Sequence, residues 1–142
     1  MRVEKGGPYM LPDGSAMYFH GVALDNSDLY RAERGPNGFT AASLVDGANS
    51  AVGEAFPVVT ADELTIYFLS DRPAGVGAYD IWVASRSSTS DPFSNATPLD
   101  ALNTPETEMP SWVSPDGCRL YFDRGGSFWQ DNQILVAERT RN

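Results

Sequence analysis

The chain of 142 residues is 42% hydrophobic and 11% aromatic, which excludes a disordered chain and is enough apolar material for one sizeable core. The net charge is −9 and the 10 Lys and Arg residues form no cluster, so nucleic acid is not expected as a partner. Cys118 is the single cysteine and excludes an intrachain disulfide. No long apolar run is present, so we expect neither a membrane span nor a signal peptide.

A twelve-residue pattern occurs three times along the chain and aligns without a gap. Each copy contains an Asp that is followed five residues later by a Tyr-Phe pair. The copies cover residues 8–19, 57–68 and 111–122, and a second shared block follows each of them at 28–34, 80–86 and 133–139. A repeat of about 50 residues indicates a propeller, a solenoid or an array, in which one copy cannot bury its own apolar face.

The second copy contains the most complete set of expected elements. Four strands are predicted, at residues 54–60, 64–69, 81–85 and 93–99. The second of them is rich in β-branched and aromatic residues, and the last, which Pro98 interrupts, suits a sheet edge. The turn between the first two strands holds Asp62-Glu63, where the other copies have Asp-Gly. Because Gly relieves the backbone at such a position, we expect the turn at Glu63 to change type.

Four short strands in about 50 residues are the pattern of one blade of a β-propeller. We therefore predict an all-β fold made of three four-stranded antiparallel blades. The chain is expected to form a single partial propeller domain over 1–142, with blade 1 at about 6–48, blade 2 at about 49–102 and blade 3 at about 103–142. Propellers close with about 4–8 blades, so three blades are too few for a ring.

The repeat resembles the WD40-like, or PD40, β-propeller repeat of the TolB family. The matching motifs are Asp80-Ile81-Trp82, Leu102-Asn103 and Ser114-Pro115-Asp116-Gly117. The resemblance extends over nearly the whole chain and implies a ring of six blades, of which this chain supplies half. It also implies a bacterial envelope or exported setting, which the sequence itself does not show.

An open half-ring exposes two apolar sheet faces, which predicts an interaction surface. Two chains joined about a twofold axis would cover both faces and complete six blades. The alternative is that further blades lie in a longer parent chain. We expect the homodimer, because an uncovered half-ring should not be soluble.

Two glutamates and two asparagines are candidate ligand-binding residues. Glu54 and Glu108 each lie eight residues before the Asp of their copy, just ahead of the inner strand. That position predicts carboxylates around the mouth of the central channel, where they would bind a cation, an amine or a basic peptide. Asn49 and Asn103 are expected to flank the same mouth. The alternatives are solvated loop charges and turn-forming amides.

Three aromatic residues are further candidates for ligand contact. Trp112 lies on an inner strand, where it would stack on a sugar or peptide or else pack between blades. Phe128 and Trp129 lie in a loop with two glycines and several hydrogen-bonding side chains, a composition that suits a binding site. The alternative is that this loop folds over its own blade.

No residue set predicts catalysis, a cofactor or a bound metal. His20 is the only histidine, no G-x-S-x-G motif is present, and the repeated Asp residues occupy turns. We therefore predict a non-enzymatic module that binds protein, peptide or glycan at the channel mouth. The alternatives are a propeller fragment of a larger hydrolase, such as a peptidase, and a lectin-like or calcium-binding propeller.

Overall fold

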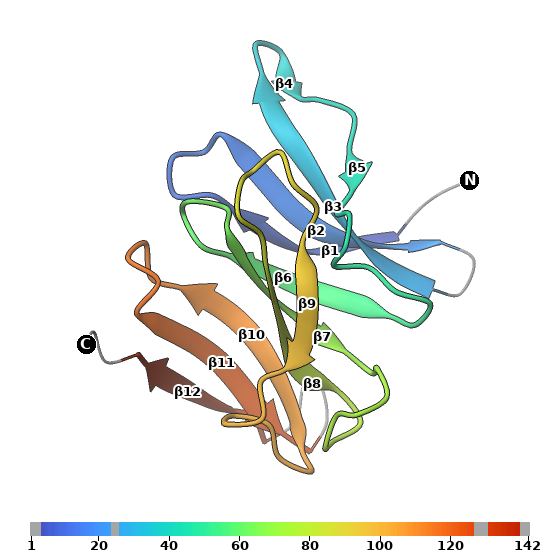
Figure 1. Ribbon diagram of the computed structural model, residues 1–142, viewed down its shortest axis with the longest axis vertical. Helices are drawn as coiled ribbons and strands as arrows, with labels where there is room; N and C mark the ends of the chain where they lie inside the picture. Colours follow the sequence, from blue (N-terminus) through green and yellow to red (C-terminus); the bar gives the residue numbers. More distant parts are fainter. Residues whose placement is uncertain (1–3, 24–25, 127–130, 140–142) are drawn as a thin grey trace.

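The computed structural model describes residues 4–23, 26–126 and 131–139, and within them the chain forms three antiparallel sheets and no helix (Figure 1). The first sheet contains β1 (Glu4–Met10), β2 (Ala16–Ala23), β3 (Asn26–Gly35), β4 (Gly38–Phe39) and β5 (Ser43–Leu44). The second contains β6 (Glu54–Val59), β7 (Thr65–Ser70), β8 (Asp80–Ser85) and β9 (Ser94–Pro98). The third contains β10 (Thr107–Val113), β11 (Arg119–Gly125) and β12 (Gln133–Glu138). The predicted all-β, antiparallel class is confirmed.

The number of strands differs from four in two of the sheets. In the first sheet the outer strand is divided, because β4 pairs with the end of β3 and β5 pairs with its middle, around Tyr30. Gly35, Pro36 and Gly38 favour the tight reversal between β3 and β4, and residues 40–42 separate β4 from β5. The third sheet has three strands within the described residues. Among the described residues, the second sheet alone has the expected four strands.

The sheets lie in chain order, with the second between the other two (Figure 1). The inner strand β6 packs on β1, β2 and β3, and the inner strand β10 packs on β6, β7 and β8. One continuous core of buried apolar side chains joins all three sheets. None of the described residues forms a helix long and apolar enough to cross a membrane.

Side chains alternate across each strand, so the Tyr-Phe pairs place one ring on each face of their sheet. We call the face with the tyrosine (Tyr18, Tyr67, Tyr121) the forward face and the face with the phenylalanine (Phe19, Phe68, Phe122) the rear face. The forward faces of the first and second sheets pack on the rear faces of the second and third, and these two junctions contain most of the core. The repeat therefore has the same structural role at both junctions.

The repeated aspartates form the turns that connect the first two strands of each sheet. In all three copies Oδ1 accepts a hydrogen bond from the backbone N–H two residues later: from Ser15 to Asp13 (2.9 Å), from Leu64 to Asp62 (3.0 Å) and from Cys118 to Asp116 (3.0 Å). The turn-forming role expected for these residues is confirmed.

The turn at Glu63 does not change type. Glu63 has a φ of 58°, beside 72° at Gly14 and 68° at Gly117, so it adopts the left-handed conformation of its glycine equivalents. That conformation is unfavourable for a side chain with a Cβ atom. The expectation from the sequence is wrong because it considered the backbone alone. The carboxylate of Glu63 is held by partners on the first sheet, as described below.

Candidate functional site

A cluster of polar side chains joins the first and second sheets. The side-chain amide of Asn49 accepts a hydrogen bond from Leu29 N (2.7 Å) and donates one to Leu29 O (3.0 Å), as a strand partner would. The next residue, Ser50, donates through its N–H (3.0 Å) and its hydroxyl to the carboxylate of Glu54. Arg72 completes the cluster, with Nε 3.1 Å from Glu54 Oε1.

The same cluster recurs between the second and third sheets. The amide of Asn103 bonds to both backbone groups of Ile81, at 2.9 and 3.0 Å. Thr104 donates to the carboxylate of Glu108 through its N–H (3.0 Å) and its hydroxyl. Arg124 Nε lies 2.8 Å from Glu108 Oε1. Each cluster thus ties the third strand of one sheet to the inner strand of the next.

The four polar residues predicted from the sequence are therefore brought together in pairs, but inside the junctions. Neither Glu54 nor Glu108 has any exposed surface, so the carboxylates do not ring an open channel mouth as expected. A buried carboxylate must be paired, and each is paired with an arginine. Ligand binding by these residues stays a prediction, and it would require displacement of the arginine.

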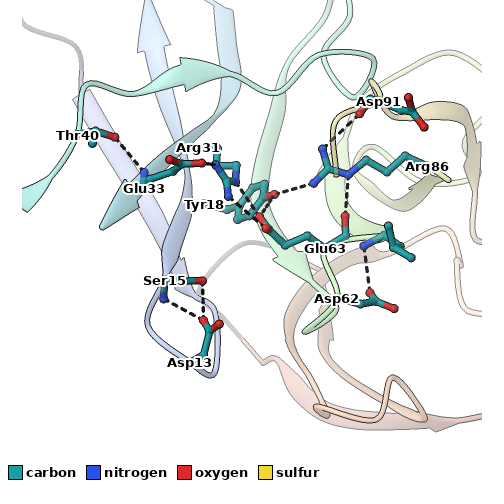
Figure 2. A network of polar contacts seen from close by, with 11 residues as sticks. Asp13, Ser15, Tyr18, Arg31, Glu33, Thr40, Asp62, Glu63, Arg86 and Asp91 are labelled. Atoms are coloured by element: carbon teal, nitrogen blue, oxygen red, sulfur yellow. Dashed lines mark hydrogen bonds and ion pairs between the residues drawn. The ribbon is translucent and has the colours of Figure 1, made fainter. Parts of the chain in front are cut away.

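A second polar network lies at the first junction (Figure 2) and has no counterpart among the described residues of the second. Glu63 accepts hydrogen bonds from Tyr18 Oη (2.7 Å) and from Arg31 Nε (2.7 Å), and the carbonyl oxygen of Glu63 accepts one from Arg86 Nε (2.8 Å). Burial raises the pKa of Glu63, but the bonds from Arg31 and Tyr18 outweigh it and leave the pKa below its usual value. Burial and the bond to Glu63 raise the pKa of Tyr18.

Arg31 and Glu63 of this network are not repeated in the other copies. The strand register places Val83 and Val136 at the position of Arg31, and the turn positions equivalent to Glu63 hold glycine. An open cleft of about 380 Å³ lies beside the network, and Glu33, Asp46 and Asp91 contribute to its lining. The guanidinium groups of Arg31 and Arg86 in the network are already paired. The network therefore serves first to hold the two sheets in register.

His20 belongs to the same junction rather than to the exposed surface. Its Nδ1 accepts a hydrogen bond from Phe56 N (3.2 Å), and the two rings lie 4.8 Å apart. Phe56 has a φ of 50° in a bulge of β6, the equivalent of Gly7 with a φ of 53°. Burial lowers the pKa of His20. The half-buried ring of His20 therefore packs between the first two sheets.

The forward face of the third sheet is uncovered. Leu29 and Ile81 occupy equivalent positions on the first two forward faces and are 0% exposed, whereas Ile134 at this position of the third face is 75% exposed. Trp112, a predicted contact residue, lies on the same face and is 43% exposed. Its ring is 5.6 Å from that of Tyr121. Exposed apolar groups of this size mark an interaction surface.

The rear face of the first sheet is partly open, since Phe19 on this face is buried but Met10 is not. Met10 is 41% exposed, although its equivalents on the second and third rear faces are buried. A largely apolar hollow of about 420 Å³ lies on this face, and Pro8, Met17 and Phe19 are among its lining residues. The Lys5 ammonium lies 5.3 Å from the centre of the Phe19 ring. The chain thus has one open face at each end of its stack of sheets.

Two of the predicted contact residues, Phe128 and Trp129, lie outside the described residues. The arginines of the two buried clusters were not predicted. Arg124 is on the strand position directly opposite Glu108, whereas Arg72 is two residues beyond the position opposite Glu54. A search for repeated positions therefore misses them. Among the described residues no group of three or more acidic, His or Cys side chains is placed to hold a metal ion.

The chain is similar in structure to TolB from Acinetobacter baumannii, with a TM-score of 0.64 and 16% sequence identity. The match covers 94% of this chain and 29% of the TolB chain, so the chain spans less than a third of that protein's length. The similarity shows that the fold is that of part of a β-propeller. No protein-family model matches the chain, and no curated protein matches it. The resemblance to the PD40 repeat stays a prediction.

Proposed function

We propose that the chain is a non-enzymatic interaction module, in which two half-propellers pair to close a six-bladed ring that binds a protein, peptide or glycan. The observation that carries the pairing is the contrast between Ile134 and its buried equivalents, Leu29 and Ile81. One position of the repeat thus holds a large apolar side chain that is buried in the core in two copies and exposed in the third. The forward face of the third sheet therefore has the composition of an interface.

The energy of covering this face supports a stable partner. Burial of a Val, Ile or Leu side chain contributes about 1.5–3 kcal/mol, and aromatic side chains such as Trp112 dominate interface energetics. Two open faces on each chain double the number of such contacts in a closed dimer. Further sheets in a longer chain would cover the faces in the same way, and the solution mass of the 142-residue chain distinguishes the two possibilities.

A ligand site on the completed ring is the second part of the proposal. Trp112 would be covered when the ring closes, so direct contact with ligand is assigned to Phe128 and Trp129. In the sequence they follow β11. A glycan array and a peptide library test this assignment. Loss of binding on Trp129→Ala, with an unchanged solution mass, supports it, and full binding by that variant contradicts it.

The proposed setting is the bacterial envelope or an exported compartment. The support is the resemblance of the repeat and the similarity to the propeller of TolB. At 16% identity the similarity concerns the fold, so the partner is left as a class, a protein, peptide or glycan. Localisation of a tagged full-length gene product in fractionated cells tests the setting, and recovery in the cytoplasmic fraction contradicts it.

A further inference from the structure

The two junctions inside the chain follow two rules of residue matching. Each rule pairs one position on a forward face with one position on the rear side of the next sheet. The first rule concerns the turn at position 14, 63 or 117. The second concerns the residue at position 7, 56 or 110, which lies in the bulge of β1 and β6 and directly before the bulge of β10. Applied to the open forward face of the third sheet, the two rules select its partner.

The first rule matches charge at the turn. At the first junction Arg31 stands on the forward face and bonds to the carboxylate of Glu63 (2.7 Å) in the next sheet. At the second junction Val83 occupies the position of Arg31, and the turn of the next sheet carries Gly117. A carboxylate therefore meets a guanidinium, and a glycine meets a valine. A carboxylate opposite a valine would be buried without a partner, which is strongly unfavourable.

The second rule matches a hydrogen-bond acceptor with a donor at the bulge. At the first junction His20 Nδ1 accepts from the backbone N–H of Phe56. At the second junction the equivalent forward residue is Leu69, which has no acceptor, and it faces Pro110, which stands directly before the bulge of β10 and has no N–H. Both Leu69 and Pro110 are buried. Neither junction therefore contains an acceptor opposite a missing donor.

The open forward face presents Val136 at the turn position and Asp123 at the bulge position. Val136 requires a glycine turn, which excludes the second sheet and its Glu63. Asp123 is an acceptor and requires a backbone N–H, which excludes the third sheet and Pro110. The first sheet satisfies both requirements, with Gly14 at its turn and Gly7 at its bulge. The first sheet is also the one with an open rear face.

We infer that the forward face of the third sheet binds the rear face of the first sheet in a second copy of this chain, with Asp123 accepting a hydrogen bond from Gly7 N–H. This inference rests on the proposed pairing of two copies and specifies which surfaces meet. Two such junctions are related by a twofold axis and close a ring of six sheets. The hollow beside Met17 and Phe19 receives the apolar side chains around Ile134.

A third contact follows the same repeat. Arg86 lies at the first junction with its Nη2 3.5 Å from Tyr18 Oη, and the equivalent Arg139 at the second junction opposes the rise in the pKa of Tyr67 that burial causes. Arg34 is the corresponding residue of the first sheet, and its Nε bonds to Gly14 O (3.0 Å) as Arg86 bonds to Glu63 O. Arg34 of the second copy therefore lies beside Tyr121.

The decisive experiment measures the dimer dissociation constant by sedimentation equilibrium for a mismatch and its repair. Gly14→Glu places a carboxylate opposite Val136 at both contacts between the two copies. We expect the dimer dissociation constant to rise about 100-fold or more. The double variant Gly14→Glu/Val136→Arg recreates the arrangement of Glu63, Arg31 and Tyr18, and we expect it to dimerise within about threefold of the original chain.

Two controls separate this effect from misfolding. In the single chain a Cβ at Gly14 meets no atom within 4 Å, and Glu63 shows that a glutamate adopts this backbone conformation, so the circular dichroism of Gly14→Glu should match that of the original chain. At the bulge, Asp123→Asn keeps an acceptor and should dimerise normally. Asp123→Leu removes the acceptor and should weaken the dimer about tenfold.

The outcomes distinguish the inference from the proposed function. If the unmodified chain is monomeric at all concentrations, the proposed pairing fails and the inference fails with it. If the chain is dimeric but Gly14→Glu dimerises as before, pairing stands and the inferred junction is wrong. The same conclusion follows if Gly14→Glu weakens the dimer and Val136→Arg does not restore it.

Discussion

Tyr18 Oη donates a 2.7 Å hydrogen bond to Glu63 Oε1 and thereby joins the second strand of the first sheet to the first turn of the second. Tyr18 is fully buried and belongs to the repeat, whereas Glu63 is the exception to the repeat. The bond explains why a glutamate occupies a backbone conformation that favours glycine. The strain at one turn is offset by a bond between sheets.

Replacement of Glu63 tests that account. Glu63→Gly relieves the backbone but leaves the buried hydroxyl of Tyr18 without its acceptor, and we expect the free energy of unfolding to fall by about 1–3 kcal/mol. The double variant Glu63→Gly/Arg31→Val copies the second junction, with its glycine and valine, and should recover most of the loss. Urea unfolding at one fixed protein concentration measures both. A single variant as stable as the original chain would refute the structural role of the pair.

Removal of a buried ion-pair partner should be far more damaging than removal of an exposed one. Arg72→Ala leaves the carboxylate of Glu54, which has no exposed surface, without its cation. We expect a loss of about 3–5 kcal/mol in the free energy of unfolding. Arg119→Ala is the matched control, since both members of its pair with Glu138 are mostly exposed, and it should change stability very little. Equal losses in the two variants would contradict the assignment.

His20 should make stability depend on pH. Burial lowers its pKa in the folded chain, so the neutral ring is favoured by folding and its contribution is fully present above the ordinary pKa of about 6.5. The contribution is lost as the pH falls through the lowered pKa, because a protonated Nδ1 no longer accepts from Phe56 N–H. The melting temperature should therefore fall more between pH 7.5 and pH 5 than it does in His20→Leu.

The comparison with His20→Leu isolates the histidine from the acidic residues, which titrate in both proteins. The variant copies Leu69 of the second junction and should be less stable at pH 7.5, because Phe56 N–H loses its acceptor. Parallel melting curves for the two proteins across this range would show that the ring does not titrate with folding.

Equivalent apolar residues on the forward faces should respond differently to the same substitution. Ile81→Ser replaces a side chain that is fully buried within the chain and should destabilise it by about 2–5 kcal/mol. Ile134→Ser changes an exposed side chain, so the secondary structure of the chain should survive while the dimer weakens. Far-ultraviolet circular dichroism and light scattering measure the two effects. A dimer that is unaffected by Ile134→Ser would place the interface elsewhere.

Local features of the fold could be predicted from the sequence, and contacts between repeats could not. The turns at Asp13, Asp62 and Asp116 follow from hydrogen bonds within three residues, so a single copy is enough to identify them. The pairing of Glu54 depends on Arg72, which occupies no repeated position and approaches through the path of a loop. Glu54 could therefore be identified from the repeat, whereas Arg72, which neutralises it, could not.

The number of strands shows the same division. The second sheet has the four strands that its own copy predicts. The outer strand of the first sheet is divided because residues 40–42 leave the sheet between β4 and β5. The open faces could be predicted from the count of repeats. Their matching through Asp123 and Val136 required the register of each strand, which assigns these residues to positions in the junction.

The molecular mass in solution tests the central claim most directly. Multi-angle light scattering of the purified 142-residue chain, from about 1 to 100 μM, should give twice the chain mass of 15.4 kDa at the upper end of this range. Gly14→Glu should shift the mass toward that of one chain, and Val136→Arg in the same chain should shift it back. A soluble protein that keeps the mass of a single chain throughout this range would contradict the account of a half-propeller completed by its own copy.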